Sequence, residues 1–491
     1  MTATTDVPIY PIDQPLTIFL IGATGDLSRH KILKALYTLF TTQLLPAQFT
    51  LVGIARADYS REEFQAFVKS IVQPSNDNEW HQFATGLHFV SGDVTDRATF
   101  EKLKQWHSQL PACGNHLWYI ATLPSLYIDI IRNMKEAGFG QTDCGWTKCM
   151  LEKPFGTDVE TAKILDNELL QIFSEDQIYR IDHFLAKETV QNILVFRFAN
   201  GLFENLWNKD FIDHIQIHST ETIGIEGREV FYDGTGTIRD VVQNHVLHLL
   251  ATTLMEQPVT LNPQDIQTKR YELLAALEPL TSEQAKTQVA YGQYQAGLIE
   301  GRIVAGYMDE KRIPPTSTTE TAVALKCFVN TPRWQGMPIY IRAGKRLQET
   351  VTEITVQFKE PKNSMFAAAG LLQKANLLTL RIGPGEGVTI RLYVKRPGIT
   401  LALQEVPVEF LYNPKYSMDL VEAYVKLIYD AVQGDPTHFP NAKGIEACWK
   451  FVQPLLEQKT KPDFKPDLYP AGSYGPDSFE QLIADDERQW Y

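Results

Sequence analysis

The chain has 491 residues, of which 44% are hydrophobic and 21% charged, and its formal net charge is −13. At roughly 150 residues per domain, this length predicts two or three domains and excludes a single small binding module. The composition is that of a globular protein. The acidic balance gives no overall attraction for nucleic acid or for an anionic membrane surface, so we expect neither as a partner.

The N-terminus and the cysteines predict a cytoplasmic protein without a metal site. Residues 1–14 contain no basic segment that leads into an apolar run, so no signal peptide is expected. The most apolar segments, 16–22 and 246–255, are shorter than the ~20 residues that cross a bilayer. The five cysteines show neither a C-x-x-C pair nor zinc-type spacing. We therefore expect buried, reduced thiols.

Strand-like and helix-like patterns alternate in the first third of the chain. Helical patterns start near Ile32 and cover 61–72 and 126–137, between strand-like runs at 17–21, 51–54, 87–90 and 116–121. Strands separated by helices predict a parallel, doubly wound sheet. We assign residues 1–180 to a Rossmann-like α/β domain that binds a dinucleotide.

Beyond residue 180 the pattern changes to alternating strands joined by turns. Such strands are indicated at 215–217, 354–358, 378–380 and 388–394. They predict an α+β domain over 181–491 with a large, mainly antiparallel sheet, which would bind substrate and form the oligomer. Helical patterns at 241–255, 419–432 and 445–456 would cover one face of that sheet, and 462–476 is expected to be an irregular tail.

A glycine turn follows the first predicted strand. Its sequence is Gly22-Ala23-Thr24-Gly25-Asp26, and it leads into a helix, where a pyrophosphate can bind free N–H groups. It is not a full G-x-G-x-x-G motif, so a tight turn without a ligand remains the alternative. At the end of the second strand Arg56 replaces the acidic residue of NAD enzymes, which favours a 2′-phosphate and hence NADP. The alternative for Arg56 is a solvated arginine, with Ser28, Arg29 and His30 as the next candidates for the 2′-phosphate.

Three further positions carry candidate chemistry. On a helix, His183 and Lys187 would share a face and could bind one anion, although a solvated charged helix is the alternative. Lys153 follows a strand-like stretch, which places it either at the ligand-binding edge of the sheet or in a plain surface turn. His245 lies on the apolar stripe of the helix after Asp240, where it is either a buried core histidine or a general base.

Together these residues resemble the glucose-6-phosphate dehydrogenase family. The resemblance rests on residues 22–27, 152–156, 180–192, 239–245, 344–345 and 469–476. It implies oxidation of β-D-glucose 6-phosphate at C1 to 6-phosphogluconolactone with hydride transfer to NADP, the first step of the oxidative pentose phosphate pathway. It also implies a homodimer or homotetramer.

The resemblance further implies a role for each matching residue. His245 would be the general base and Asp182 its orienting partner. The substrate would be bound by Lys153, His183, Lys187, Glu221, Asp240 and Lys345, with His183 and Lys187 at the phosphate. The cofactor would be bound by Gly22, Ala23, Thr24, Gly25, Asp26, Leu27, Lys31, Arg56 and Lys153.

The chain departs from the family pattern at several positions. Phe184 replaces a tyrosine whose hydroxyl contacts the phosphate, and Ala186 replaces a glycine. Thr350 and Val351 stand where a basic residue is common, so a second, structural NADP site is not expected. Two other functions stay open: a dehydrogenase of an unphosphorylated sugar or another hexose phosphate, and a catalytically silent NADP-binding protein.

Overall fold

The chain folds into two compact units. The computed structural model describes residues 14–109, 114–140, 144–361, 364–371, 374–412 and 422–491. Unit 1 comprises Met1–Ala186, Asn262–Gln267 and Val421–Ala442, and unit 2 comprises Lys187–Leu261, Thr268–Leu420 and Lys443–Tyr491. Among the described residues, we find no helix with the length and hydropathy of a membrane span.

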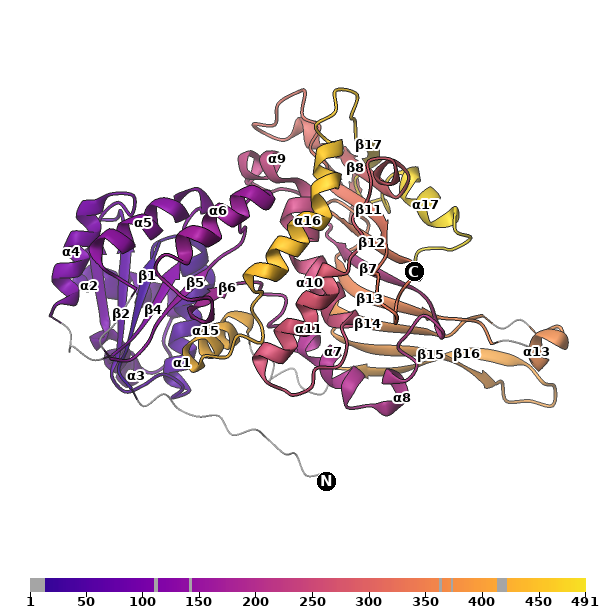
Figure 1. Ribbon diagram of the computed structural model, residues 1–491, viewed down its shortest axis with the longest axis horizontal. Coiled ribbons are helices and arrows are strands. Elements are labelled where there is room, and N and C mark those ends of the chain that lie inside the picture. Colours follow the sequence, from indigo (N-terminus) through magenta and orange to yellow (C-terminus); the bar gives the residue numbers. More distant parts are fainter. Residues whose placement is uncertain (1–13, 110–113, 141–143, 362–363, 372–373, 413–421) are drawn as a thin grey trace. The chain divides into compact units, whose positions relative to one another are not determined.

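Unit 1 is built on a six-stranded parallel sheet (Figure 1). Its strands are β1 (Leu16–Ile21), β2 (Phe49–Ala55), β3 (Leu87–Ser91), β4 (Asn115–Ile120), β5 (Thr147–Leu151) and β6 (Ile178–Arg180). They are arranged in the order β3-β2-β1-β4-β5-β6, the doubly wound order in which the carboxyl edge near β1 and β4 binds ligands. The predicted parallel α/β sheet is confirmed.

Helices lie on both faces of the unit 1 sheet, which is why every residue of β1 is buried. They are α1 (Leu33–Thr41), α2 (Arg61–Val72), α3 (Asp77–Thr85), α4 (Arg97–His107), α5 (Tyr127–Ala137) and α6 (Val159–Leu169). A π-helical turn, Ser28–Ile32, precedes α1. A capping box between Ser60 and Glu63 fixes the start of α2.

Helix α15 (Ala423–Gln433) belongs to unit 1, although more than two hundred residues separate it from the last strand of that unit. Its Leu427 and Ile428 join the core formed by Leu36 of α1. The expectation that this helical pattern covers the second sheet is therefore wrong. α15 ends at Gly434, whose φ is +85°, and Lys148 of β5 binds its last turn, since its Nζ donates to the Ala431 and Val432 carbonyls at 2.8 and 3.0 Å.

The cysteines only partly match the expected reduced thiols. Cys149, Cys327 and Cys448 are buried and free. Burial raises the pKa of the Cys149 and Cys327 thiols, which keeps both protonated and unreactive. Cys144 is disulfide-bonded, so the expectation is wrong there.

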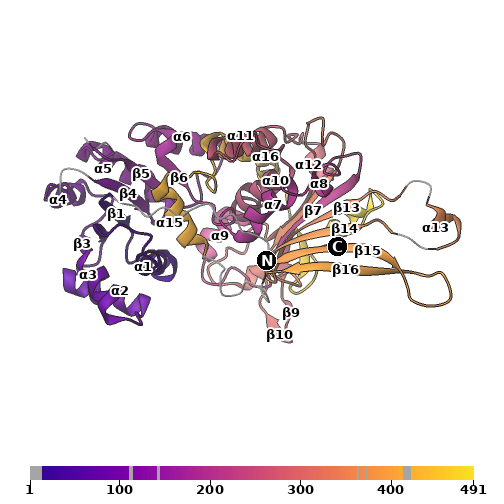
Figure 2. The same ribbon diagram turned by 90° about the horizontal axis from the view of Figure 1, so that it is seen from below.

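Unit 2 contains a nine-stranded mixed sheet in the order β16-β15-β14-β13-β7-β12-β11-β8-β17. The strands are β7 (Ile212–Thr220), β8 (Val289–Gln295), β11 (Ala322–Cys327), β12 (Ile339–Gly344), β13 (Val351–Phe358), β14 (Leu377–Gly383), β15 (Gly387–Lys395), β16 (Leu403–Leu411) and β17 (Asp467–Pro470). All neighbours are antiparallel except β7 with β12 and β8 with β17. This confirms the mainly antiparallel sheet, and Figure 2 shows strands β13 to β16 side by side.

The segment expected to be an irregular tail contains the edge strand β17. Asp467 to Pro470 pair with Gly292 to Gln295 of β8, and Tyr469 is fully buried in this pairing. The prediction is wrong here because a four-residue edge strand that contains a proline has too few residues to show an alternating pattern. β9 (Gly297–Ile299) and β10 (Arg302–Val304) form a separate hairpin.

The helices that position functional residues in unit 2 pack on its sheet. Helix α7 (Glu188–Phe198) packs on β14, and the π-helical segment Ile238–Val246 packs on β7 and β12. The other helices are α8 (Gly201–Glu204), α9 (Glu229–Thr237), α10 (Leu247–Leu254), α11 (Pro263–Ala275, which begins in unit 1), α12 (Gln284–Thr287), α13 (Met365–Ala368), α16 (Ala442–Gln458) and α17 (Asp477–Ala484).

Candidate functional site

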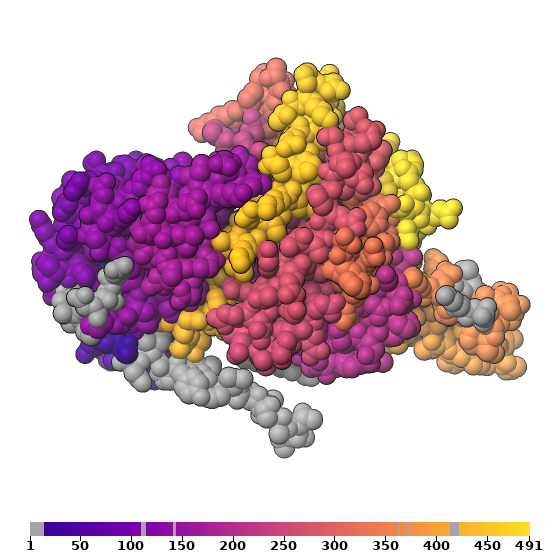
Figure 3. Space-filling model, viewed as in Figure 1, coloured from indigo at the N-terminus to yellow at the C-terminus, as the bar shows by residue number. Residues whose placement is uncertain are grey.

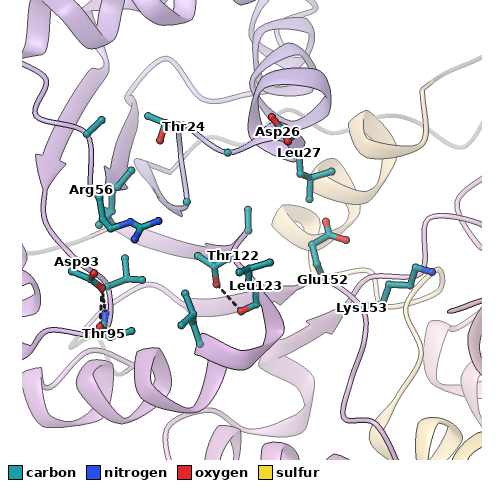
Figure 4. Close-up of a pocket in the computed structure, with 18 of the residues that line it drawn as sticks. Thr24, Asp26, Leu27, Arg56, Asp93, Thr95, Thr122, Leu123, Glu152 and Lys153 are labelled. Carbon is teal, nitrogen blue, oxygen red and sulfur yellow. Dashed lines mark hydrogen bonds between the residues drawn. The ribbon is translucent and has the colours of Figure 1, made fainter. Parts of the chain in front are cut away.

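A cavity of about 960 Å³ opens at the carboxyl edge of the unit 1 sheet (Figure 4). Seven of the nine residues predicted to bind the cofactor line it: Gly22, Thr24, Gly25, Asp26, Leu27, Arg56 and Lys153. Ala23 is fully buried and Lys31 does not line the cavity. The lining also includes His183, so the residues expected at the cofactor and one expected at the substrate phosphate share a cavity within unit 1.

The turn after β1 has the geometry that a pyrophosphate site needs. Gly22 has a φ of +87°, and a Cβ atom there would lie 2.4 Å from the Ala121 carbonyl oxygen. The Ser28 hydroxyl donates to the Gly22 carbonyl at 2.9 Å, and Arg29 Nε donates to the Thr24 carbonyl at 2.9 Å. Both side chains thus hold the turn itself, and the amides at the start of the following helix are left at the cavity.

Arg56 extends from the end of β2 into the cavity in Figure 4. Asp93, in the loop after β3, accepts hydrogen bonds from the amide and hydroxyl of Thr95 at 2.9 and 2.8 Å. These bonds are the main cause that lowers the pKa of Asp93, with Arg56 a smaller contributor. The Asp93 carboxylate therefore closes its own turn, while Arg56 is the cation in the lining at this end of the cavity.

Lys31 forms an ion pair with Glu422, the N-cap residue of α15. Its Nζ lies 3.0 Å from Glu422 Oε1, and both side chains are almost half exposed. An exposed pair of this kind contributes little to stability, because water screens it. The pair nevertheless sets where the Lys31 ammonium lies relative to α15, which begins at the next residue after Glu422.

Glu152 and Tyr424 are pocket residues to which the sequence assigned no role. The Glu152 carboxyl accepts a hydrogen bond from the Tyr119 hydroxyl at 2.6 Å. Burial raises the pKa of Glu152 to about 7, while hydrogen bonds from Tyr119 and Tyr424 and the charge of Lys153 partly offset that rise. No local pattern could have indicated Tyr424, because it reaches the cavity only through the packing of α15 on unit 1.

The His183 segment is a turn and not the predicted helix. Asp182 is buried, and its Oδ1 accepts from the Phe184 amide at 3.0 Å while its carbonyl accepts from the Leu185 amide at 3.0 Å. This Asx-type turn replaces the first helical hydrogen bonds, so α7 begins only at Glu188 with Lys187 at its N-cap. The His183 ring stacks on Tyr424 with centroids 6.4 Å apart, and the Phe184 ring lies 5.1 Å from His183.

In unit 2, Lys345 and Glu221 form an ion pair through Nζ and Oε2. The Lys345 side chain is buried, whereas that of Glu221 is 40% exposed. The ammonium lies 5.6 Å from the Tyr232 ring centroid, which adds a cation–π contact. A buried donor beside a carboxylate open to solvent is suited to binding vicinal hydroxyls.

Asp240 and His245 lie on the same π-helical segment, Ile238–Val246. In a π-helix the hydrogen bond joins residue i to i+5, so these two residues are one turn apart. In an α-helix, as the sequence predicts, five residues would rotate them well away from each other. His245 is buried, and the Asp240 charge contributes to the raised pKa of Tyr232.

Family models, sequence relatives and solved structures all match this chain to one family over nearly its whole length. The models for the NAD-binding and C-terminal domains of glucose-6-phosphate dehydrogenase match residues 19–192 and 194–491. A glucose-6-phosphate 1-dehydrogenase from Aggregatibacter actinomycetemcomitans is 40% identical over 480 residues, which are 96% of each chain. A solved glucose-6-phosphate dehydrogenase in complex with glucose 6-phosphate has a TM-score of 0.89 at 31% identity and covers 98% of this chain and 99% of that one. The glucose-6-phosphate 1-dehydrogenase of Mycobacterium avium has a TM-score of 0.82 at 31% identity, covering 97% and 99%.

Proposed function

We propose that this chain, which belongs to the glucose-6-phosphate dehydrogenase family, oxidises β-D-glucose 6-phosphate at C1 to the 1,5-lactone and uses NADP as the hydride acceptor. The cavity at the carboxyl edge of the unit 1 sheet carries the proposal, because one lining holds the glycine turn, Arg56 and His183. That arrangement suits a dinucleotide at one end and a phosphorylated substrate at the other.

The residues present fit NADP. A Cβ atom at Gly22 would clash with the Ala121 carbonyl, so glycine permits the tight turn that brings the helix amides to the cavity. Arg56 would supply a cation for a 2′-phosphate. We assign Gly22 to Leu27 to the pyrophosphate and Lys153 to the junction with the substrate. The bound cofactor would supply the nicotinamide C4 that accepts the hydride.

We assign the proton transfer to His245. A neutral imidazole removes the C1 hydroxyl proton as the C–H electron pair leaves as hydride, and the C1 carbonyl of the lactone forms. Asp182 would orient the imidazole and stabilise its charged form. Lys345, Glu221 and Asp240 would bind the sugar hydroxyls, and His183 with Lys187 the phosphate.

Initial rates with glucose 6-phosphate and with glucose, each with NADP and NAD, test the proposal. We expect the highest kcat/KM for glucose 6-phosphate with NADP. A higher value for glucose would favour the unphosphorylated-sugar dehydrogenase. An absence of turnover with all four pairs, together with tight NADP binding, would favour the silent NADP-binding protein.

Phe184→Tyr tests the weakened phosphate site. The phenyl ring lies beside His183 and offers no hydroxyl, so we expect the phosphate to lack one charge-assisted hydrogen bond, worth about 1.5 to 3 kcal/mol. Restoring the hydroxyl should lower the KM for glucose 6-phosphate several-fold, less than the full value of the bond, because a water can already take the place of the missing hydroxyl. It should leave kcat unchanged, since the bond would act equally in the ground and transition states. The rate with glucose serves as the control. An unchanged or raised KM would place residue 184 away from the phosphate.

We also propose that the chain self-associates through the β15–β16 end of the unit 2 sheet. Leu392, Val394, Val408 and Phe410 on these strands are 39 to 53% exposed. The space-filling view shows this end as the orange lobe at the right (Figure 3). An apolar surface on an edge hairpin favours a second copy. Val394→Lys with Val408→Lys should shift the sedimentation coefficient toward that of a monomer, and an unchanged value would rule this surface out.

A further inference from the structure

The hydroxyl of Tyr469 is fixed against the backbone of Lys345. Tyr469 is fully buried on β17, and its hydroxyl donates to the Lys345 carbonyl at 2.6 Å. The Lys345 amide donates in turn to the Thr321 carbonyl at 2.9 Å. The amide and the carbonyl of Lys345 are therefore both bound, one by Thr321 just before β11 and the other by Tyr469 on β17.

The hydrogen bonds around Tyr469 run in one direction. The Tyr294 amide donates to Thr321 Oγ1 at 2.9 Å, and Thr321 Oγ1 lies 3.0 Å from the Tyr469 hydroxyl oxygen. A phenol has one proton, which goes to the Lys345 carbonyl, so the Thr321 hydroxyl must donate to Tyr469. Burial raises the pKa of Tyr469, which keeps the phenol protonated as a donor. The chain Tyr294, Thr321, Tyr469, Lys345 is thus satisfied at every step.

The turn that carries Lys345 has little freedom on either side. A Cβ atom at Gly344 would lie 2.4 Å from the Ala322 Cβ, so the strand end is closely packed. Arg346 has a φ of +53°, a left-handed conformation that costs energy for a residue with a side chain. A strained turn of this kind persists only where its surroundings over-determine it, and the Tyr469 hydroxyl is one such constraint.

We infer that Tyr469 is a positioning residue for substrate selection, which acts by holding the Lys345 backbone so that its ammonium pairs with Glu221 at the sugar hydroxyls. The inference rests on the proposed function, because it takes Lys345 and Glu221 as substrate ligands. Tyr469 itself is fully buried, and its hydroxyl is taken up by Lys345 and Thr321, so it would act through Lys345 and not by contact with the sugar.

The variant Tyr469→Phe removes only the hydroxyl and leaves the Lys345 carbonyl without its partner. We expect the KM for glucose 6-phosphate to rise roughly five- to tenfold, the size of one lost buried hydrogen bond, with kcat and the KM for NADP within about twofold. A structural role alone would not change discrimination among sugars. We therefore also expect a smaller ratio of kcat/KM for glucose 6-phosphate to kcat/KM for each of its 2-deoxy, 3-deoxy and 4-deoxy analogues.

Tyr294→Phe provides the matched control. Tyr294 is buried on the neighbouring strand β8, and its hydroxyl donates to Glu310 Oε1 at 3.1 Å instead of to the Lys345 carbonyl. This variant should lower the Tm by a similar amount without changing the KM or the deoxy-sugar discrimination. An equal rise in KM for both variants would overturn the inference. If Tyr469→Phe does not fold, Thr321→Val is measured instead. It removes the donor to Tyr469 and leaves the bond to Lys345, so we expect a smaller rise in KM with the same narrowing of deoxy-sugar discrimination, and no change in either would overturn the inference.

Lys345→Gln separates a failure of the inference from a failure of the proposed function. A raised KM for this variant combined with an unchanged KM for Tyr469→Phe would overturn the inference and leave the proposed substrate site standing. An unchanged KM for Lys345→Gln would remove Lys345 from the substrate site, and the inference would fall with it.

Discussion

We expect His245→Asn to lower kcat by roughly 10² to 10⁴-fold, the usual contribution of a positioned general base, with the KM for glucose 6-phosphate nearly unchanged. The imidazole is buried on the π-helical segment that also carries Asp240. Asparagine keeps a polar side chain of similar size but cannot accept a proton. Single-turnover and steady-state rates at neutral pH measure the loss.

His248→Asn is the control for this prediction. His248 is also buried, one turn further along on α10, and we assign it no catalytic role. It should lower the Tm without a comparable loss of kcat. If His245→Asn instead raises KM and leaves kcat intact, His245 is a structural histidine of the core.

We expect Arg56→Ala to raise the KM for NADP roughly ten- to a hundredfold and to change that for NAD little, since a charge-assisted hydrogen bond to a phosphate is worth about 1.5 to 3 kcal/mol. Arg56 is exposed in the cavity lining at the end of β2, so its removal leaves no buried group unpaired. The ratio of the two KM values, measured with saturating glucose 6-phosphate, is the readout.

Arg29→Ala is the control, because it disturbs the glycine turn without removing the cation expected at the 2′-phosphate. Arg29 holds the Thr24 carbonyl and stacks 5.0 Å from the Phe67 ring, so its loss should weaken NAD and NADP binding alike. An equal effect of Arg56→Ala on both cofactors would assign the 2′-phosphate to another residue. His30 is then the next candidate, because Ser28 and Arg29 hold the turn.

The sequence predicts the elements of unit 1 well because its strands are short apolar runs between helices with clear periodicity. The predicted helix at 61–72 matches α2 at both ends, where a capping box fixes its start. The position of α15 could not be predicted, since an amphipathic pattern shows that a helix packs but not on which core. The sequence therefore predicted neither the place of Tyr424 in the cavity nor the ion pair between Lys31 and Glu422.

Two local features of the candidate site also escape sequence reasoning. Charged residues four apart near His183 suggest a helix, but the Asp182 side chain bonds the backbone and forms a turn instead. The π-helical winding at Ile238–Val246 changes which residues share a face with His245, and no residue pattern indicates it. The direction of the His183 side chain therefore depends on one side-chain hydrogen bond, and that of His245 on the local winding of its helix.

The fate of the C1 hydrogen tests the central claim most directly. With [1-²H]glucose 6-phosphate and NADP, we expect a reduced cofactor one mass unit heavier than the one formed from unlabelled substrate, with the deuterium at nicotinamide C4. The sugar product should be the unlabelled lactone or its hydrolysis product. Mass spectrometry of both products gives the result. Reduced cofactor without deuterium, or deuterium retained in the oxidised sugar, would contradict hydride transfer from C1.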